Sequence, residues 1–142
     1  MEINPEFTKT QKECLKYLLD NKTTEVLFGG AAGGGKSWVG VSYLILMCIE
    51  YPCTRYLMGR SKLDALKTTT LNTFFEVCTA WNLKAIKDYT FNGSSNVITF
   101  FNGSEIILKD LFLYPSDRNF DSLGSLEITG AFIDEANQIT EK

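Results

Sequence analysis

Two hydrophobic patterns alternate along the chain. Apolar positions at helical spacing cover residues 8–21, 36–50 and a segment that begins at Ser61 and reaches Trp81. Short apolar runs, of the length typical of buried strands, occur at 26–28, 56–58 and 131–133. The resulting order of helix, strand, helix, strand, helix predicts an α/β fold with a parallel sheet flanked by helices.

A different pattern interrupts this order in the second half of the chain. Apolar runs at 86–91, 97–101 and 106–111 are separated by Asn92-Gly93 and Asn102-Gly103. Both dipeptides are typical of tight hairpin turns, because asparagine and glycine tolerate the positive φ that such turns require. We therefore expect an antiparallel β-meander over about 86–111, inserted into the α/β order.

The composition fits one folded domain spanning residues 1–142, since 44% of the residues are hydrophobic and 22% are charged. A net charge of −3 excludes a strongly basic protein that coats nucleic acid. The absence of histidine excludes histidine-dependent catalysis and histidine metal sites.

The four cysteines form no C-x-x-C pair, which favours reduced thiols over a zinc site. The longest apolar run, 39–49, is too short to span a membrane.

A glycine-rich segment between the first apolar run and the second helical stripe fits the pattern G-x-x-x-x-G-K-[ST]. Its glycines let backbone N–H groups converge on a phosphate, to which the following helix adds its dipole. The lysine then reaches the β- and γ-phosphates, and the serine hydroxyl is a ligand for Mg²⁺. The alternative is a flexible turn, but the strand before it and the helix after it favour an ATP and Mg²⁺ site. The expected nucleotide-binding residues are Gly30, Ala31, Ala32, Gly33, Gly34, Gly35, Lys36 and Ser37.

Two acids follow the last apolar run directly. We expect Asp134 to complete the Mg²⁺ shell opposite Ser37, and Glu135 to orient and polarise a water for attack on the γ-phosphate. An aspartate at a strand end is also a common helix N-cap, so the pair is informative only beside the phosphate-binding motif. With that motif, it favours ATP hydrolysis.

Other residues are candidates with competing explanations. Gln11 precedes Gly30 by 19 residues. In several ATPases a glutamine at this place reads the adenine edge, and a nearby aromatic residue, here Phe7, packs on the base. Alternatively, Gln11 forms a capping box with Thr8. Arg60, after the second apolar run, is the preferred residue to stabilise phosphate charge during hydrolysis.

Arg118, in a polar loop, is the alternative arginine for that role. Scattered lysines are either contacts to a DNA backbone or solvated surface. They are Lys62, Lys67, Lys84, Lys87 and Lys109.

Taken together, these motifs resemble the ATPase domain of tailed-bacteriophage terminase large subunits. The resemblance is carried by segments 7–11, 29–37 and 57–60, and by the hairpin at 101–107 followed by the strand at 130–136. It implies a P-loop NTPase core that hydrolyses ATP to package double-stranded DNA into a procapsid. It also implies a homo-oligomeric ring docked on the portal protein, a small terminase subunit as partner, and the cytoplasm of the host bacterium as location.

The sequence departs from that family in length. Members run to several hundred residues with a metal-dependent nuclease domain, and nothing like that domain follows Glu135, so we expect an ATPase domain incomplete at its C-terminal end. Two alternatives stay open: a helicase-like, nucleic-acid-dependent ATPase, against which the hairpin at 101–107 argues, and a nucleotide-binding module without turnover. A GTPase is disfavoured because Asn21-Lys22-Thr23-Thr24 lacks the aspartate of a guanine-reading motif.

Overall fold

The computed structural model describes residues 7–20, 26, 35–111 and 128–135. The strand expected at 26–28 lies outside these residues apart from Val26, as does the loop that holds Arg118. The elements are α1 (Lys9–Leu19), α2 (Lys36–Glu50), β1 (Arg55–Arg60), α3 (Leu63–Ala65), the π-helical turn η1 (Leu66–Thr70), α4 (Leu71–Ala80), β2 (Tyr89–Asn92), β3 (Val97–Phe100), β4 (Glu105–Asp110) and β5 (Gly130–Ile133).

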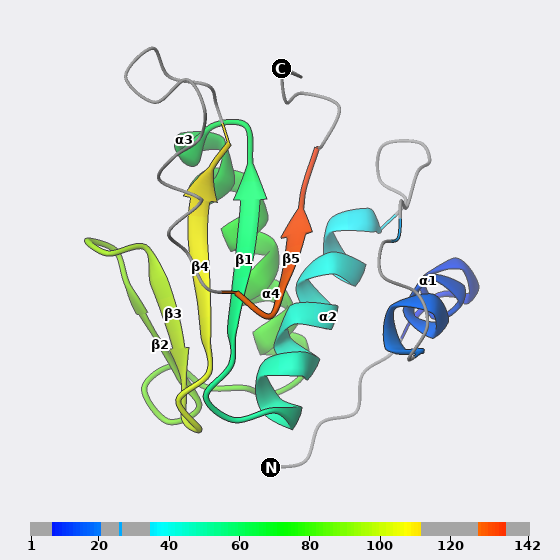
Figure 1. Ribbon diagram of the computed structural model, residues 1–142, viewed down its shortest axis with the longest axis horizontal. Coiled ribbons are helices and arrows are strands. Elements are labelled where there is room, and N and C mark those ends of the chain that lie inside the picture. Colours follow the sequence, from blue (N-terminus) through cyan, green and yellow to red (C-terminus); the bar gives the residue numbers. More distant parts are fainter. Residues whose placement is uncertain (1–6, 21–25, 27–34, 112–127, 136–142) are drawn as a thin grey trace.

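The five described strands form one mixed sheet in the order β2-β3-β4-β1-β5. The β1 strand is parallel to both β4 and β5, whereas β2, β3 and β4 form an antiparallel meander. This arrangement confirms the predicted α/β fold with an inserted meander. Because β1, β4 and β5 all run in one direction, their carboxyl ends share one edge of the sheet (Figure 1).

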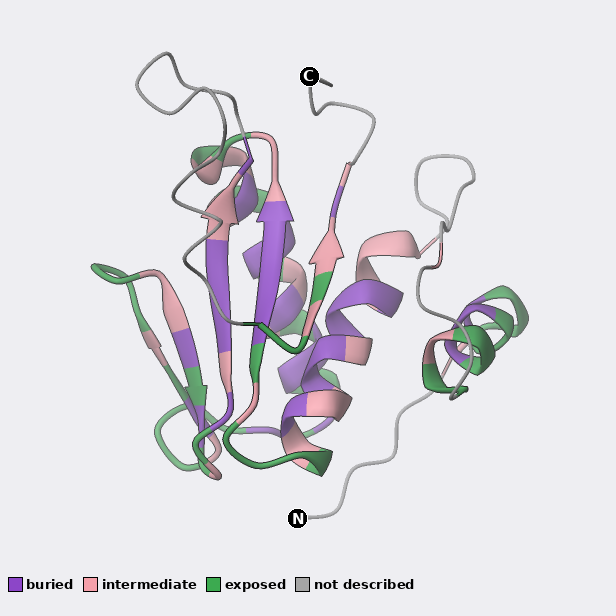
Figure 2. Ribbon diagram, viewed as in Figure 1, coloured by how far each residue is buried: buried purple, intermediate pink, exposed green. Residues whose placement is uncertain are grey.

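The helices α2 and α4 pack against each other and on the sheet, and α1 packs on the outside of α2 (Figure 1). The main core lies between these helices and the sheet, and its buried side chains come mostly from α2, α4, β1, β3 and β4 (Figure 2). Alternate residues of each strand enter this core, as the two-residue period of a strand requires. Tyr56 and Met58 of β1 thus lie beside Ile106 and Leu108 of β4. None of the helices in the described ranges has the length and apolar character needed to cross a bilayer.

A glycine in α2 allows the helix to approach β5 closely. A Cβ atom added to Gly40 would overlap the ring of Phe132 from β5. Glycine within a helix normally costs about 1 kcal/mol relative to alanine. Here the glycine allows direct contact between the helix that carries Ser37 and the strand that precedes Asp134.

The first hairpin differs in detail from the prediction. The first strand begins at Tyr89 rather than at Ile86, because the preceding residues form a turn. Asp88 closes this turn, since its Oδ2 accepts from the Lys84 backbone N–H at 2.8 Å. Ile86 has a φ of 75° and lies exposed. The turn after Asn92 is also longer than two residues, since Asn92 pairs with Val97.

The second hairpin is tied to the end of α2. Asn102 Nδ2 donates to the carbonyl oxygen of Cys48 at 2.7 Å, and Ser104 Oγ donates to that of Tyr51 at 2.6 Å. Gly103 has a φ of 86°, which its lack of a side chain permits. Because the last carbonyls of a helix have no partner within it, the hairpin side chains stabilise the end of α2. The Asn-Gly-Ser motif therefore has a structural role.

The third helical segment differs from the prediction in two ways. It begins at Leu63 rather than at Ser61, because Lys62 keeps an extended backbone (φ −130°, ψ 139°). It also contains the turn η1, in which the N–H of Leu71 bonds to the carbonyl of Leu66, five residues earlier. The sequence pattern predicted neither feature.

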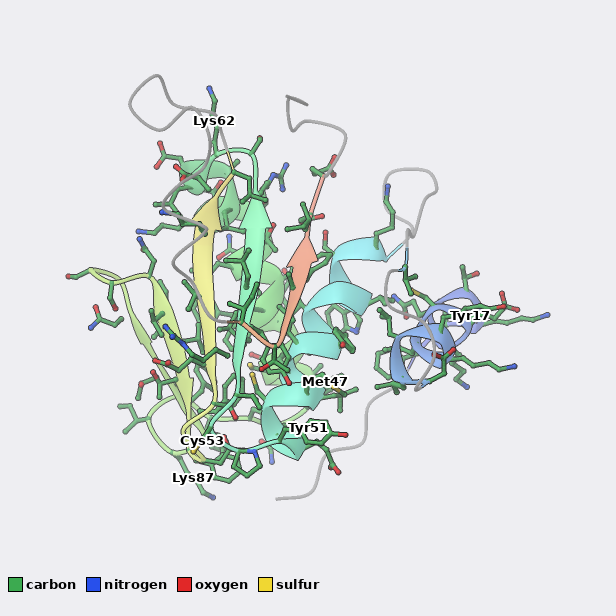
Figure 3. The ribbon with its side chains drawn as sticks, viewed as in Figure 1. Tyr17, Met47, Tyr51, Cys53, Lys62 and Lys87 are labelled. Carbon is green, nitrogen blue, oxygen red and sulfur yellow. The ribbon has the colours of Figure 1, made fainter. Side chains whose placement is uncertain are left out.

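The cysteines differ sharply in accessibility. Cys14, Cys48 and Cys78 are buried, whereas Cys53 is exposed, at the end of the molecule opposite Lys62 (Figure 3). Burial raises the pKa of both Cys48 and Cys78 from 9.0 to about 12. Between these two pH values the thiols stay neutral in the folded state but ionise in the unfolded chain. The stability that comes from burying the neutral thiols is therefore present below pH 9.0 and is lost as the pH rises towards about 12.

We expect Cys53 alone to react with a thiol reagent in the native protein at pH 8, since thiolates are the reactive species and the other thiols are shielded. Absorbance at completion should correspond to one thiol per chain, rising to four in denaturant. A Cys53→Ser variant serves as the control and should lose the native reaction. Modification of Cys48 at the rate of Cys53, mapped by mass spectrometry, would contradict the packing described here.

Candidate functional site

Ser37 and Asp134 meet at the carboxyl edge of the sheet although 97 residues separate them. The Ser37 hydroxyl lies 3.1 Å from Asp134 Oδ1 and 3.0 Å from Oδ2. Ser37 is in the first turn of α2, and Asp134 follows β5, which α2 contacts directly. The serine of the glycine-rich motif and the first acid of the pair therefore form one site.

The oxygen donors at this site suit Mg²⁺, the ion that the motif implies. Mg²⁺ binds oxygen ligands at 2.0–2.1 Å in an octahedron, in which neighbouring ligand atoms lie about 2.9 Å apart. Ser37 Oγ and the Asp134 oxygens, which are hydrogen-bonded at 3.0–3.1 Å, lie close enough together to serve one ion. Among the residues that the structure describes, no group of three or more histidines, cysteines or acids forms a metal cluster. The donor set thus fits an ion held mainly by a nucleotide and water.

The helix α2 begins as a phosphate-binding segment requires. Its N-cap is Gly35, which has the left-handed conformation (φ 77°), and Lys36 is its first residue. A helix N-terminus presents unpaired N–H groups and a positive dipole to an anion. The preceding motif residues, 30–34, lie outside the described part of the chain.

Gln11 lies directly against this N-terminus. Its Nε2 donates to the Gly35 carbonyl at 3.2 Å, and its Oε1 accepts from the Thr8 N–H at 2.9 Å. Thr8 Oγ1 in turn accepts from the Gln11 N–H, which completes the predicted capping box. A glutamine amide has two donor hydrogens and two acceptor lone pairs, so one of each remains after these bonds.

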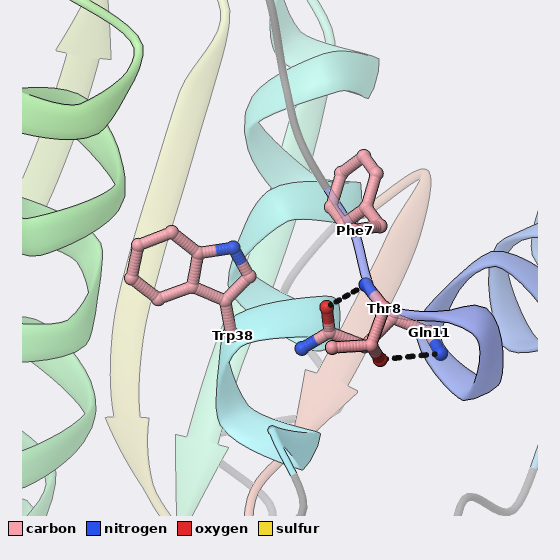
Figure 4. A pocket seen from close by; sticks show the side chains of 4 residues that line it. All are labelled: Phe7, Thr8, Gln11 and Trp38. Atoms are coloured by element: carbon pink, nitrogen blue, oxygen red, sulfur yellow. Dashed lines mark hydrogen bonds between the residues drawn. The ribbon is translucent and has the colours of Figure 1, made fainter.

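A cavity of about 360 Å³ adjoins Gln11. It is lined by Phe7, Thr8, Gln11 and Trp38, with both aromatic rings beside the glutamine amide (Figure 4). Trp38 directly follows Ser37 in α2, so the cavity and the Ser37–Asp134 site share that helix. The sequence analysis missed Trp38; its place next to the phosphate-binding motif was the available signal.

Arg60 lies at the same edge of the sheet. Gly59 pairs with Ile133 in register, so the next residue of each strand, Arg60 and Asp134, are neighbours. The Arg60 guanidinium lies 3.7 Å from Asp134 Oδ2, and its side chain is only 15% exposed. It also donates to Thr69 Oγ1 at 2.6 Å. The structure therefore places Arg60 beside the carboxylate of Asp134.

Glu135 directly follows, and its backbone N–H donates to Asp134 Oδ1 at 3.1 Å. Its φ of 51° is uncommon for a residue with a side chain, and such conformations cluster at functional sites. Glu135 is half-buried, unlike Asp134, which is buried.

The lysines considered as DNA contacts are not gathered in one place. Lys62 and Lys87 lie at opposite ends of the molecule (Figure 3). Lys67 Nζ lies 3.5 Å from the carbonyl oxygen of Gly93, in the β2–β3 turn. These positions define no single basic patch, so they carry no argument for a DNA contact.

The sequence analysis also missed Thr70. Its hydroxyl donates to Asp134 Oδ2 at 2.7 Å, and the residue is buried. A signal was present: Thr70 is spaced four residues from both Leu66 and Phe74, on the apolar stripe of its helix, where a hydroxyl is unexpected. Buried polar groups at such positions need a partner elsewhere in the fold.

Comparison with known proteins identifies a similar fold. No protein-family model and no curated protein matches the chain. Among solved structures, the chain is similar to the large terminase from the thermophilic bacteriophage D6E, with 17% identity and a TM-score of 0.67 over 96% of this chain. The complex of that terminase with ADP gives 16% identity and a TM-score of 0.69, and the complex with ATP-γ-S gives 18% and 0.60.

The TM-scores establish a shared fold, and the predicted resemblance to large terminases is confirmed at that level. The chain covers 33% of the length of the D6E terminase chain. It therefore corresponds to about a third of that protein.

Proposed function

We propose that this chain is an Mg²⁺-dependent ATPase domain of large-terminase type, which powers packaging of double-stranded DNA into a procapsid. The observation that carries the proposal is the contact of the Ser37 hydroxyl with the Asp134 carboxylate at 3.0–3.1 Å. It joins the glycine-rich motif to the acid pair, in a fold similar to terminase structures that hold ADP and ATP-γ-S.

Each residue has a defined part in this proposal. The loop 30–35 and the N-terminus of α2 bind the phosphates, while Lys36 neutralises charge on the β- and γ-phosphates. Ser37 and Asp134 hold the Mg²⁺ ion, directly or through its water ligands. That ion supplies charge neutralisation and fixes the phosphate oxygens. Glu135 orients the attacking water and accepts its proton.

The base is bound in the cavity beside Gln11. Adenine presents a donor and an acceptor on one edge, which match the acceptor and donor that remain on the Gln11 amide. Phe7 and Trp38 line the same cavity and would supply apolar aromatic contact to the base. Arg60 lies beside Asp134 and stabilises the charge that develops on the transferred phosphate.

The same proposal covers the assembly. Duplex DNA is the translocated substrate, and the working unit is a homo-oligomeric ring of large subunits on the portal protein, with the small terminase subunit as partner. The location is the cytoplasm of the infected bacterium.

ATP hydrolysis with and without DNA tests this function. We expect Mg²⁺-dependent phosphate release that duplex DNA stimulates more than single-stranded DNA, and that falls to background in Lys36→Ala. Stimulation by single-stranded DNA alone would instead support a helicase-like ATPase. Nucleotide binding without turnover would support a non-catalytic module, and a strong preference for GTP would refute the assignment.

A further inference from the structure

The Asp134 carboxylate is held from several sides. Oδ1 accepts from the Glu135 N–H, and both oxygens contact the Ser37 hydroxyl. Oδ2 also accepts from Thr70 Oγ1 at 2.7 Å, the shortest of these contacts, and lies 3.7 Å from the Arg60 guanidinium. Hydroxyl bonds to a carboxylate of this length are charge-assisted and stronger than neutral ones.

Thr70 behaves differently from the other threonines of its helical segment. A helical threonine commonly donates its hydroxyl to the carbonyl four residues earlier. That bond is made by Thr68, Thr69, Thr73 and Thr79. Thr70 donates instead to Asp134, across 64 residues of sequence.

A π-helical turn lies at this point of the segment. Thr70 is the last residue of η1, and Leu71 closes the wide turn by bonding to Leu66. Single π-helical turns inside helices are rare and frequent at functional sites. Here the turn carries two adjacent hydroxyls to one site: Thr70 bonds to Asp134, and Thr69 accepts from the Arg60 guanidinium.

We propose that Thr70 is a positioning residue, which η1 holds in place so that its hydroxyl fixes the orientation of the Asp134 carboxylate towards Mg²⁺. This inference rests on the proposed function. The Thr70 and Ser37 hydroxyls both contact Oδ2, so Thr70 holds the carboxylate at the point where it meets the other expected Mg²⁺ ligand. Thr69 gives Arg60 a second anchor, which keeps its charge beside the same oxygen.

The experiment compares Thr70→Val, which keeps the shape but removes the hydroxyl, with Thr70→Ser, which restores it. Thr79→Val is the matched control, because Thr79 lies exposed on the same segment and donates only to the Phe75 carbonyl. The readout is the affinity of Mn²⁺ for the protein–ADP complex, followed by electron paramagnetic resonance. The affinity for ADP in EDTA is measured in parallel.

Loss of a group that orients a metal ligand typically weakens metal affinity by about 10–100-fold, and we expect Thr70→Val to fall in that range. Thr70→Ser should stay close to the wild type, Thr79→Val should match it, and the affinity for ADP in EDTA should not change in any variant. If Thr70→Val does not fold, as judged by its melting curve, Thr70→Ala against Thr70→Ser makes the same comparison.

Equal Mn²⁺ affinity in Thr70→Val and the wild type would overturn the inference and leave the proposed function standing. Equal weakening in Thr70→Ser and Thr70→Val would also overturn it, because the hydroxyl would then not be the cause. If the wild type binds Mn²⁺ no better with ADP than without, the proposed function itself fails.

Discussion

Replacing Glu135 with glutamine is expected to stop ATP hydrolysis while ATP binding persists. The change keeps the size of the side chain and removes the carboxylate that would accept a proton from the attacking water. General-base catalysis typically contributes about 10²–10⁴-fold, so phosphate release should fall by at least about 100-fold. The affinity for Mg²⁺-ATP, measured by calorimetry, should change little, because Ser37 and Asp134 remain in contact.

The matched control is Glu76→Gln, which makes the same chemical change at an exposed position of α4. It should hydrolyse ATP at the wild-type rate. Lys36→Ala provides the contrast, since it should lose nucleotide affinity as well as turnover. Full activity in Glu135→Gln would show that another group orients the water. Loss of ATP binding in that variant would mean that Glu135 acts in binding rather than in catalysis.

Replacing Phe74 with alanine is expected to have the largest effect on stability. Phe74 is fully buried, and its ring makes edge-to-face contacts with Tyr89 and Phe100. The ring centroids are 5.2 Å apart for Tyr89 and 6.3 Å apart for Phe100. It thereby joins α4 to the meander. Removing a buried phenylalanine side chain lowers the free energy of unfolding by about 3–5 kcal/mol, a large part of the total for a small domain.

Urea unfolding followed by circular dichroism measures this change. Phe101→Ala is the control, because the Phe101 side chain is 58% exposed in the β3–β4 turn. The free energy of unfolding of Phe101→Ala should differ from that of the wild type by no more than about 0.5 kcal/mol, so its urea midpoint should change little. Similar midpoints for both variants would contradict the placement of Phe74 at the centre of the core.

The sequence predicted those parts of the site that local motifs define. In the sequence, the glycine-rich motif and the acid pair each follow an apolar run that predicts a strand, and parallel strands bring their carboxyl ends to one edge. The meeting of Ser37 with Asp134 was therefore foreseeable. The approach of Arg60 to Asp134 depends on the register of β1 with β5, which the sequence does not specify.

The features that were not predicted arise from tertiary contacts or rare geometry. The turn η1 adds a residue to a helical pattern that is otherwise regular, so the pattern did not single out Thr70. The hairpin after Asn92 has the sequence of a two-residue turn, but the Asn92 side chain accepts from the N–H groups of Ser94 and Ser95 and stabilises a longer loop. Side-chain competition of this kind is difficult to read from sequence.

The contact of Gly40 with Phe132 has a mechanical consequence. Because no space separates the helix from the strand at this point, α2 cannot tilt towards β5, and a shift of α2 in that direction has to carry the strand with it. A displacement of the start of α2 towards β5 would therefore carry Ser37 and Asp134 together.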